Sequence, residues 1–175
     1  LLAGHDVLGV MPTGAGKSVC YQIPAALSPG MTLVISPLIS LMRDQVDALN
    51  DLGLPAAFIN TTQTPDEQAM VFAQAAAGQI KLLYVAPERL ETGRFRDFAA
   101  RTPISLIAVD EAHCVSQWGQ DFRSSYLGIG DFIAGLPQRP PVGAFTATAT
   151  ERVRRDIVGR LGVRHPAVTV TGIDR

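Results

Sequence analysis

Residues Asp6-Val-Leu-Gly-Val-Met-Pro-Thr-Gly-Ala-Gly-Lys-Ser18 run from a short apolar stretch through a glycine-rich turn and directly into a helix-like stretch. This order of elements is typical of a phosphate-binding loop, in which backbone N–H groups and the positive end of the helix face phosphate oxygens. Lys17 would reach the β- and γ-phosphates, and Ser18 would hold Mg²⁺. The predicted nucleotide-binding residues are Gly14, Ala15, Gly16, Lys17 and Ser18.

Met11 occupies the position at which the general pattern G-x-x-x-x-G-K-[ST] has its first glycine. Taken alone, the segment could therefore be a glycine-rich turn with an exposed lysine. Further motifs that follow in the expected order along the chain favour the phosphate-binding interpretation.

Short apolar runs, many of them β-branched, alternate with helix-like stretches along the whole chain. The predicted strands are Asp6 to Val10, Thr32 to Ile35, Ala56 to Ile59, Lys81 to Val85, Ile104 to Val109, Val142 to Phe145 and Ala167 to Val170. The predicted helices are Lys17 to Leu27, Leu38 to Leu52, Pro65 to Ala77, Phe95 to Ala100, Ser124 to Ala134 and Thr150 to Leu161. Strands that are apolar almost throughout, such as Ile104 to Val109, are typical of parallel strands covered by helices on both faces. We therefore expect an α/β fold with an open, mostly parallel sheet of about seven strands and a ligand site at their carboxyl ends.

The composition indicates one globular domain of 175 residues, with 47% apolar and 18% charged residues. No apolar run approaches the roughly 20 residues that span a bilayer, so we expect no membrane association. The net charge of −1 gives no overall attraction for nucleic acid. Cys20 and Cys114 are far apart and indicate neither a disulfide nor a zinc site, which favours a reducing, intracellular compartment. The absence of a secretory signal agrees with that location, and Leu1 at the start suggests a piece of a longer chain.

Two adjacent carboxylates follow the most apolar predicted strand in the string Asp110-Glu-Ala-His113. At the carboxyl end of a buried strand, Asp110 would bind Mg²⁺, and Glu111 would orient and deprotonate the attacking water. The alternative is an acidic pair that merely favours the N-terminus of a helix. His113 by itself would more often be a structural histidine than a catalytic one.

Four strings besides Asp110-Glu-Ala-His113 carry a resemblance to the RecQ family of superfamily 2 DNA helicases. They are Met11-Pro-Thr-Gly-Ala-Gly-Lys-Ser-Val-Cys-Tyr-Gln-Ile-Pro24, Ser36-Pro-Leu-Ile-Ser-Leu-Met-Arg-Asp-Gln-Val46, Tyr84-Val-Ala-Pro-Glu-Arg-Leu90 and Val115-Ser-Gln-Trp-Gly-Gln-Asp-Phe-Arg123. Thr146-Ala-Thr148 follows in the order that the superfamily shows. The chain resembles the first RecA-like motor lobe of that family along nearly its whole length.

The resemblance implies ATP- and Mg²⁺-dependent 3′-to-5′ unwinding of DNA, with single-stranded DNA and junction-containing duplex as partners. It implies catalytic roles for Lys17, Asp110, Glu111 and His113. It places Ser36, Pro37, Arg43, Pro87, Glu88 and Arg89 in motifs that track DNA, and Thr146 and Thr148 in a motif that couples the ATP state to movement. Small hydroxyls and arginine suit such phosphate contacts.

Ser116 to Arg123 resembles the family's aromatic-rich loop, which senses single-stranded DNA through Gln117, Trp118, Phe122 and Arg123. These side chains offer a hydrogen-bonding group, stacking faces and charge. The alternative is a tryptophan and a phenylalanine that anchor a surface loop to the core. Gln120, where the family commonly has histidine, cannot become cationic, and Ser124 and Ser125 replace a usual proline and acidic residue, so coupling strength is in question.

By the same resemblance, residues 1–175 form one N-terminal ATP-binding lobe. The adenine-reading motif would precede the chain, and the second lobe with its arginine finger, the zinc-binding part and the winged helix would follow it. Zinc is expected only there. Alone, this monomeric lobe would hydrolyse ATP negligibly and bind single-stranded DNA weakly and salt-sensitively. It would act in the cytoplasm or nucleoid of a bacterium or the nucleus of a eukaryote. A catalytically silent nucleic-acid clamp or docking module, and an RNA helicase lobe, are the alternatives.

Overall fold

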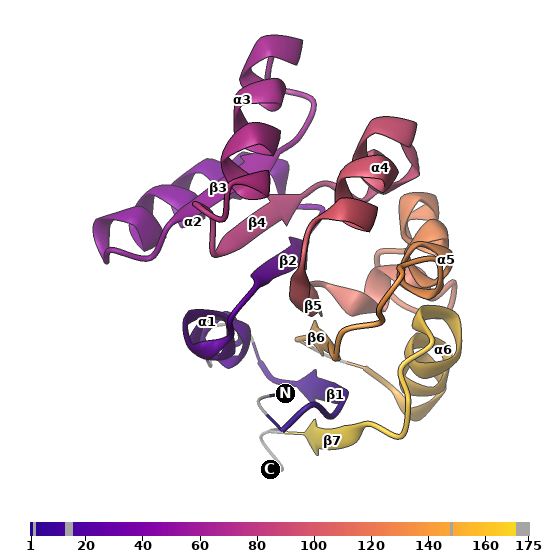
Figure 1. Ribbon diagram of the computed structural model, residues 1–175. Coiled ribbons are helices and arrows are strands. Elements are labelled where there is room, and N and C mark those ends of the chain that lie inside the picture. The colour runs from indigo at the N-terminus through magenta and orange to yellow at the C-terminus, as the bar shows by residue number, and fades with distance from the viewer. Residues whose placement is uncertain (2, 13–15, 148, 171–175) are drawn as a thin grey trace.

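The computed structural model describes residues 1, 3–12, 16–147 and 149–170, and its centre is a parallel seven-stranded sheet (Figure 1). The strands are β1 (Val7–Val10), β2 (Met31–Ile35), β3 (Ala56–Ile59), β4 (Leu82–Val85), β5 (Ile104–Val109), β6 (Val142–Thr146) and β7 (Ala167–Val170). Their order across the sheet is β3-β4-β2-β5-β6-β1-β7, and every pairing is parallel. The seven predicted strands are therefore confirmed.

Within the described residues, six α-helices connect these strands, and the predicted set is confirmed with one correction. They are α1 (Val19–Leu27), α2 (Ile39–Asp51), α3 (Pro65–Ala76), α4 (Gly93–Arg101), α5 (Ile129–Ala134) and α6 (Glu151–Leu161). The prediction of one helix from Ser124 to Ala134 was wrong, because its first half is the 3₁₀ helix η3 (Ser124–Gly128). There the Tyr126 hydroxyl donates to the Asp110 carbonyl at 2.8 Å, and this buried contact holds a tighter turn.

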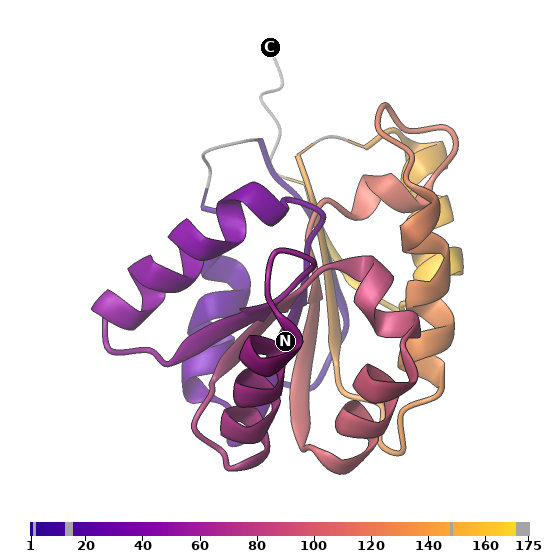
Figure 2. The ribbon, with the colours of Figure 1, turned by 90° about the horizontal axis from the view of Figure 1, so that it is seen from above.

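Helices lie on both faces of the sheet (Figure 2), and a hydrophobic core lies on each face. One core contains side chains of α1 and α2, and the other contains side chains of α3, α4, α5 and α6. Strand β5 serves both, because Leu106 and Ala108 face the first core whereas Ile107 and Val109 face the second. None of the helices in the described part of the chain is long and apolar enough to cross a membrane.

The strand order divides the predicted motifs between two halves of one sheet edge. Because all strands are parallel, the segments that follow them emerge at the same edge. The neighbouring strands β5, β6 and β1 precede the predicted nucleotide and coupling motifs. The neighbouring strands β4 and β2 precede the predicted DNA-tracking motifs, in the 3₁₀ helix η1 (Pro87–Glu91) and at the start of α2.

Asp6 fixes the opposite, amino end of β1. Asp6 is 4% exposed, and its side chain accepts hydrogen bonds from the backbone N–H groups of Val142 at 2.9 Å and Arg164 at 2.7 Å. It also forms an ion pair with the Arg139 guanidinium. Burial disfavours the carboxylate, but these hydrogen bonds and the charge of Arg139 outweigh burial, so the pKa of Asp6 lies below its ordinary value.

We expect Asp6→Asn to lower the free energy of unfolding at neutral pH by about 1.5–3 kcal/mol, the contribution typical of hydrogen bonds to a charged group. Because the folded-state pKa is depressed, this contribution is present above the unfolded pKa near 3.9 and is lost as the pH falls through the folded pKa. Urea unfolding of parent and variant should therefore converge in strong acid. Asp51→Asn, at an exposed residue that ends α2, is the matched control, and an equal loss in both variants would contradict the prediction.

Candidate active site

The turn between β1 and α1 carries the predicted phosphate-binding residues. Gly16 has a φ of 77°, a left-handed conformation that favours glycine. The first helical turn begins there, because Val19 and Cys20 donate backbone hydrogen bonds to Gly16 and Lys17 at 3.1 Å each. The Ser18 side chain caps none of the described N–H groups of α1, so its hydroxyl does not serve as a helix cap. Gly14 and Ala15 lie outside the described residues.

Asp110 and Glu111 emerge from the carboxyl end of β5. Asp110 is 8% exposed, and its Oδ1 accepts a hydrogen bond from the Glu111 N–H at 2.9 Å. Burial, together with the charge of Glu111, raises the pKa of Asp110 above its ordinary value, and the charge of Lys17 opposes that rise. Glu111 has a φ of 50°, a left-handed conformation that costs a residue other than glycine about 1–3 kcal/mol. The fold thus keeps both residues at the end of β5, although Asp110 is buried and the backbone of Glu111 is strained.

A line of side chains joins the ends of three strands. Lys17 Nζ lies 3.6 Å from Glu111 Oε1, and Glu111 Oε2 lies 3.6 Å from His113 Nδ1. The same His113 nitrogen lies at hydrogen-bonding distance, 2.7 Å, from Thr146 Oγ1. Three of the four predicted catalytic residues and one predicted coupling residue are therefore joined in one series of contacts. Thr148 lies outside the described residues.

The chemistry of this cluster fits a divalent cation bound with a triphosphate. Asp110 and Glu111 carry two negative charges when ionised, against one positive charge on Lys17. A buried carboxylate whose pKa is raised by its surroundings regains its charged form most easily beside a cation. Carboxylate and hydroxyl oxygens, as offered by Asp110 and Ser18, are ligands that Mg²⁺ prefers.

The aromatic-rich loop, residues 116–123, is attached to the Asp110–His113 turn by small and polar groups. Gly119 lies so close that a Cβ atom there would be 3.0 Å from the His113 carbonyl oxygen. The Arg123 N–H donates to the Cys114 carbonyl at 2.9 Å. Trp118 and Phe122 remain 59% and 36% exposed. This exposure disfavours the alternative in which these two aromatic residues anchor the loop to the core.

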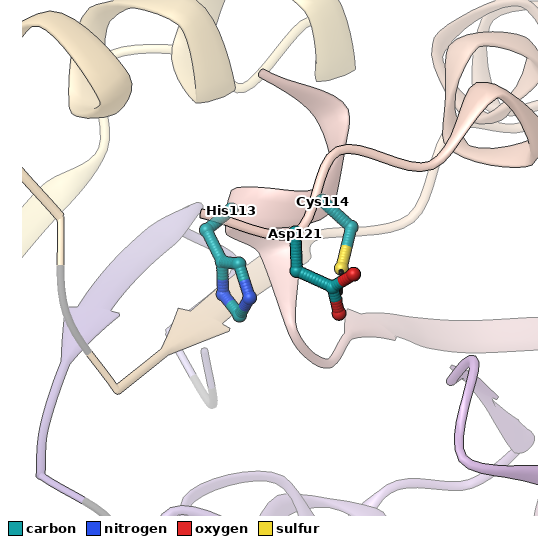
Figure 3. Close-up of side chains that lie close together, drawn as sticks. All are labelled: His113, Cys114 and Asp121. Carbon is teal, nitrogen blue, oxygen red and sulfur yellow. Dashed lines mark hydrogen bonds between the residues drawn. The ribbon is translucent and has the colours of Figure 1, made fainter. Parts of the chain in front are cut away.

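His113, Cys114 and Asp121 meet at the base of this loop, with one possible ligand atom from each within 4.8 Å of the others (Figure 3). Burial raises the pKa of the Cys114 thiol to about 12, which disfavours a thiolate ligand. Asp121 Oδ2 already accepts hydrogen bonds from Arg123 Nε at 3.3 Å and Nη2 at 3.2 Å. The cation that neutralises the Asp121 carboxylate is thus the Arg123 guanidinium. The cluster of His113, Cys114 and Asp121 therefore holds the loop in place.

The predicted DNA-tracking residues lie beyond the ends of β2 and β4. Ser36 is 1% exposed, and its hydroxyl accepts a hydrogen bond from the Leu38 N–H at 3.2 Å, so it shapes the turn into α2. Arg43 is exposed, with its guanidinium 5.6 Å from the centre of the Phe58 ring. Arg89 is half-buried in η1 and lines a hollow of about 190 Å³. Pro37 is half-buried, Pro87 is buried, and Glu88 and Gln117 are exposed.

Comparison with known proteins agrees with this geometry. Residues 1–157 match the family model described as DEAD/DEAH box helicase. The chain is 47% identical over 174 residues to "ATP-dependent DNA helicase RecQ" of Haemophilus influenzae, which covers 99% of this chain and 28% of the relative. It is 48% identical over 173 residues to the Bacillus subtilis protein of the same name, with 99% and 29% covered. The chain thus spans less than a third of the length of these relatives.

The fold has counterparts among solved structures. The helicase domain of Hef from Pyrococcus furiosus superposes with a TM-score of 0.73 at 22% identity, covering 97% of this chain and 35% of that one. A hypothetical ATP-dependent RNA helicase from Sulfolobus tokodaii gives a TM-score of 0.72 at 22% identity, covering 97% and 49%. These likenesses establish the RecA-like helicase fold. With that fold, the family match and the RecQ similarity along almost its whole length, the chain belongs to the DEAD/DEAH box helicases.

Proposed function

We propose that the chain is the N-terminal ATP-binding lobe of an ATP-dependent 3′-to-5′ DNA helicase of the RecQ type. The observation that carries the proposal is the line of contacts from Lys17 through Glu111 and His113 to Thr146, with the aromatic-rich loop packed against His113 at Gly119. A path of this kind joins a nucleotide site to a surface that nucleic acid can reach.

Lys17 and Glu111 are the residues whose partners would change during a cycle. The Lys17 ammonium lies 3.6 Å from the Glu111 carboxylate. A triphosphate offers Lys17 a stronger partner than the Glu111 carboxylate. Once Lys17 binds the phosphates, Glu111 is free to accept a proton from the attacking water. Ser18 and Asp110 would hold Mg²⁺, which supplies charge stabilisation to the phosphates when it is bound. His113, between Glu111 and Thr146, would report the change to β6.

DNA is the proposed partner, as single strands and junction-containing duplex. Exposed Trp118 and Phe122 offer stacking faces, and Arg43 and Arg89 offer positive charge to phosphates. Arg123, whose side chain is 41% exposed in its pair with Asp121, offers further N–H donors. The relatives at 47–48% identity are named DNA helicases, whereas the RNA helicase at 22% shares only the fold. An RNA helicase lobe is therefore the less favoured alternative. A silent clamp is disfavoured because Lys17, Ser18, Asp110 and Glu111 are all present.

The remaining parts of the proposal concern the setting. Residues 1–175 would form one lobe that is monomeric by itself, works inside the cell, and acts with a second lobe that supplies an arginine finger. Zinc would be bound outside residues 1–175. These assignments follow from the similarity to longer RecQ proteins, of which this chain covers 28% or 29%.

The test is ATP hydrolysis and strand separation by the longest natural polypeptide that contains this chain. We expect turnover to rise with single-stranded DNA and a duplex with a 3′ single-stranded tail to be unwound. An equal response to single-stranded RNA would favour the RNA helicase alternative. Nucleic-acid binding without any hydrolysis would favour the silent clamp.

A further inference from the structure

Trp118, in the aromatic-rich loop, is covered on one face by a cation from α6. The guanidinium carbon of Arg152 lies 3.4 Å from the centre of the Trp118 ring, which is van der Waals contact. The rest of the indole is open, since Trp118 is 59% exposed. Arg152 therefore occupies a stacking surface that would otherwise face solvent.

Helix α6 holds the loop at two points one helical turn apart. Arg152 covers Trp118, and four residues later Asp156 Oδ2 accepts a hydrogen bond from Ser116 Oγ at 2.7 Å. Residues four apart lie on the same face of a helix. Ser116 is buried, whereas the Arg152–Trp118 stack is exposed. The root of the loop is thus fixed, and its tip is held by a contact that solvent can reach.

This stack lies next to the residues that join the nucleotide site to the loop. A hollow of about 430 Å³ is lined by both the loop and the start of α6. Its lining includes His113, Trp118, Gln120, Thr150 and Val153. Helix α6 begins at Glu151, shortly after β6 ends at Thr146, the residue that contacts His113. Trp118 is therefore positioned by segments that also contact the line of side chains running from Lys17 through Glu111 and His113 to Thr146.

We propose that Arg152 is a positioning residue that holds Trp118 against α6 and competes with a nucleic-acid base for the face of the indole. The inference rests on the proposed function, since it requires single-stranded DNA to reach the loop. Stacking of a base on an aromatic side chain is stronger than an exposed cation–π contact, so a base displaces the guanidinium. Arg152 thereby raises the DNA concentration needed to engage Trp118 by about 2- to 5-fold.

The first test measures acrylamide quenching of Trp118 fluorescence without DNA. Trp118 is the sole tryptophan of the 175-residue chain, so the signal has one source. We expect Arg152→Ala to increase the quenching constant, because it uncovers one face of the ring. Arg155→Ala is the matched control, since Arg155 is an exposed arginine of the same helix. An unchanged quenching constant in Arg152→Ala would overturn the proposal.

The second test titrates the longest natural polypeptide that contains this chain with a single-stranded oligonucleotide. It uses the highest salt concentration at which the parent still binds, where the lost charge matters least. We expect Arg152→Ala to bind about 2- to 5-fold more tightly than the parent. Arg152→Lys should shift in the same direction, because lysine keeps the charge but lacks the planar stacking group. Weaker binding by Arg152→Ala, matching that of Arg155→Ala, would overturn the proposal. A parent polypeptide that binds no single-stranded DNA even at low salt would contradict the proposed function, and the quenching measurement without DNA would still decide the role of Arg152.

Discussion

Replacing Lys17 by alanine is expected to lower ATP turnover by about 10²–10³-fold, the loss typical when one preorganised charge-stabilising group is removed from an active site. Lys17 is the cation that lies against Glu111, and its charge is one of the influences that lower the pKa of Asp110. Alanine would remove the group that meets the phosphates and would also remove a positive charge that favours the ionised form of Asp110. Both effects act against binding of Mg²⁺ with ATP. Turnover is measured in the longest natural polypeptide that contains this chain, and nucleotide affinity in the 175-residue chain.

Lys81→Ala is the matched control, because Lys81 is the chain's other lysine. It precedes β4, at the amino edge of the sheet, and its Nζ donates to the Ser28 carbonyl at 2.6 Å. This variant should lose some stability and keep its nucleotide affinity and turnover. If Lys17→Ala and Lys81→Ala hydrolysed ATP equally fast, Lys17 would have no part in the reaction and the proposed function would fail.

The sheet could be predicted from the sequence because its strands are apolar on both faces. In β5, for example, Leu106 and Ala108 pack on one side and Ile107 and Val109 on the other, so the whole run is hydrophobic and easy to locate. The secondary structure of the segment from Ser124 to Ala134 was harder to predict. Its apolar spacing suits a helix, but a long-range hydrogen bond from Tyr126 to Asp110 decides its first turn. No local pattern encodes that contact.

Within the candidate site, the functional residues could be predicted from their types and their order in the sequence. The contacts between them could not. Adjacent carboxylates after an apolar strand indicate a metal site, yet nothing in Asp110-Glu-Ala-His113 reveals the left-handed backbone of Glu111. The contacts of Trp118 with Arg152 and of Ser116 with Asp156 join segments more than 30 residues apart. Neither arginine nor aspartate on a helix is unusual, so the sequence carried no signal for them. Gly119 could have been suspected, as a glycine within a string of larger side chains.

The strand order explains how one sheet edge could serve two ligands. Neighbours β5, β6 and β1 hold the contacts from Lys17 to Thr146, whereas neighbours β2 and β4 lead into the predicted DNA-tracking segments. The aromatic-rich loop follows β5, next to β2 in the sheet, and so begins where the two halves meet. A loop at that boundary is well placed to respond to both the nucleotide and the DNA. Helix α6 restrains this loop from the β6 side.

Glu111→Gln should separate binding from hydrolysis, with turnover about 10²–10⁴-fold lower and nucleotide affinity kept or increased. Glutamine cannot accept the proton of the attacking water, but it also no longer pairs with Lys17 as an ion, which leaves the ammonium available to phosphates. Its effect on Asp110 is opposite to that of Lys17→Ala. The charge of Glu111 raises the pKa of Asp110 and that of Lys17 lowers it, so removing Glu111 favours the Asp110 carboxylate and removing Lys17 disfavours it.

The two variants are therefore expected to diverge in a titration with a fluorescent ATP analogue and Mg²⁺, although both lose turnover. Glu67→Gln, in the exposed first turn of α3, is the matched control and should change neither quantity. A Glu111→Gln protein that loses affinity as Lys17→Ala does would mean that Glu111 serves to hold the site together. One that keeps turnover near the parent's would remove Glu111 from the proton transfer. Intact binding with lost turnover leaves proton acceptance as the role of Glu111, because the substitution retains its size, its backbone conformation and its neighbours.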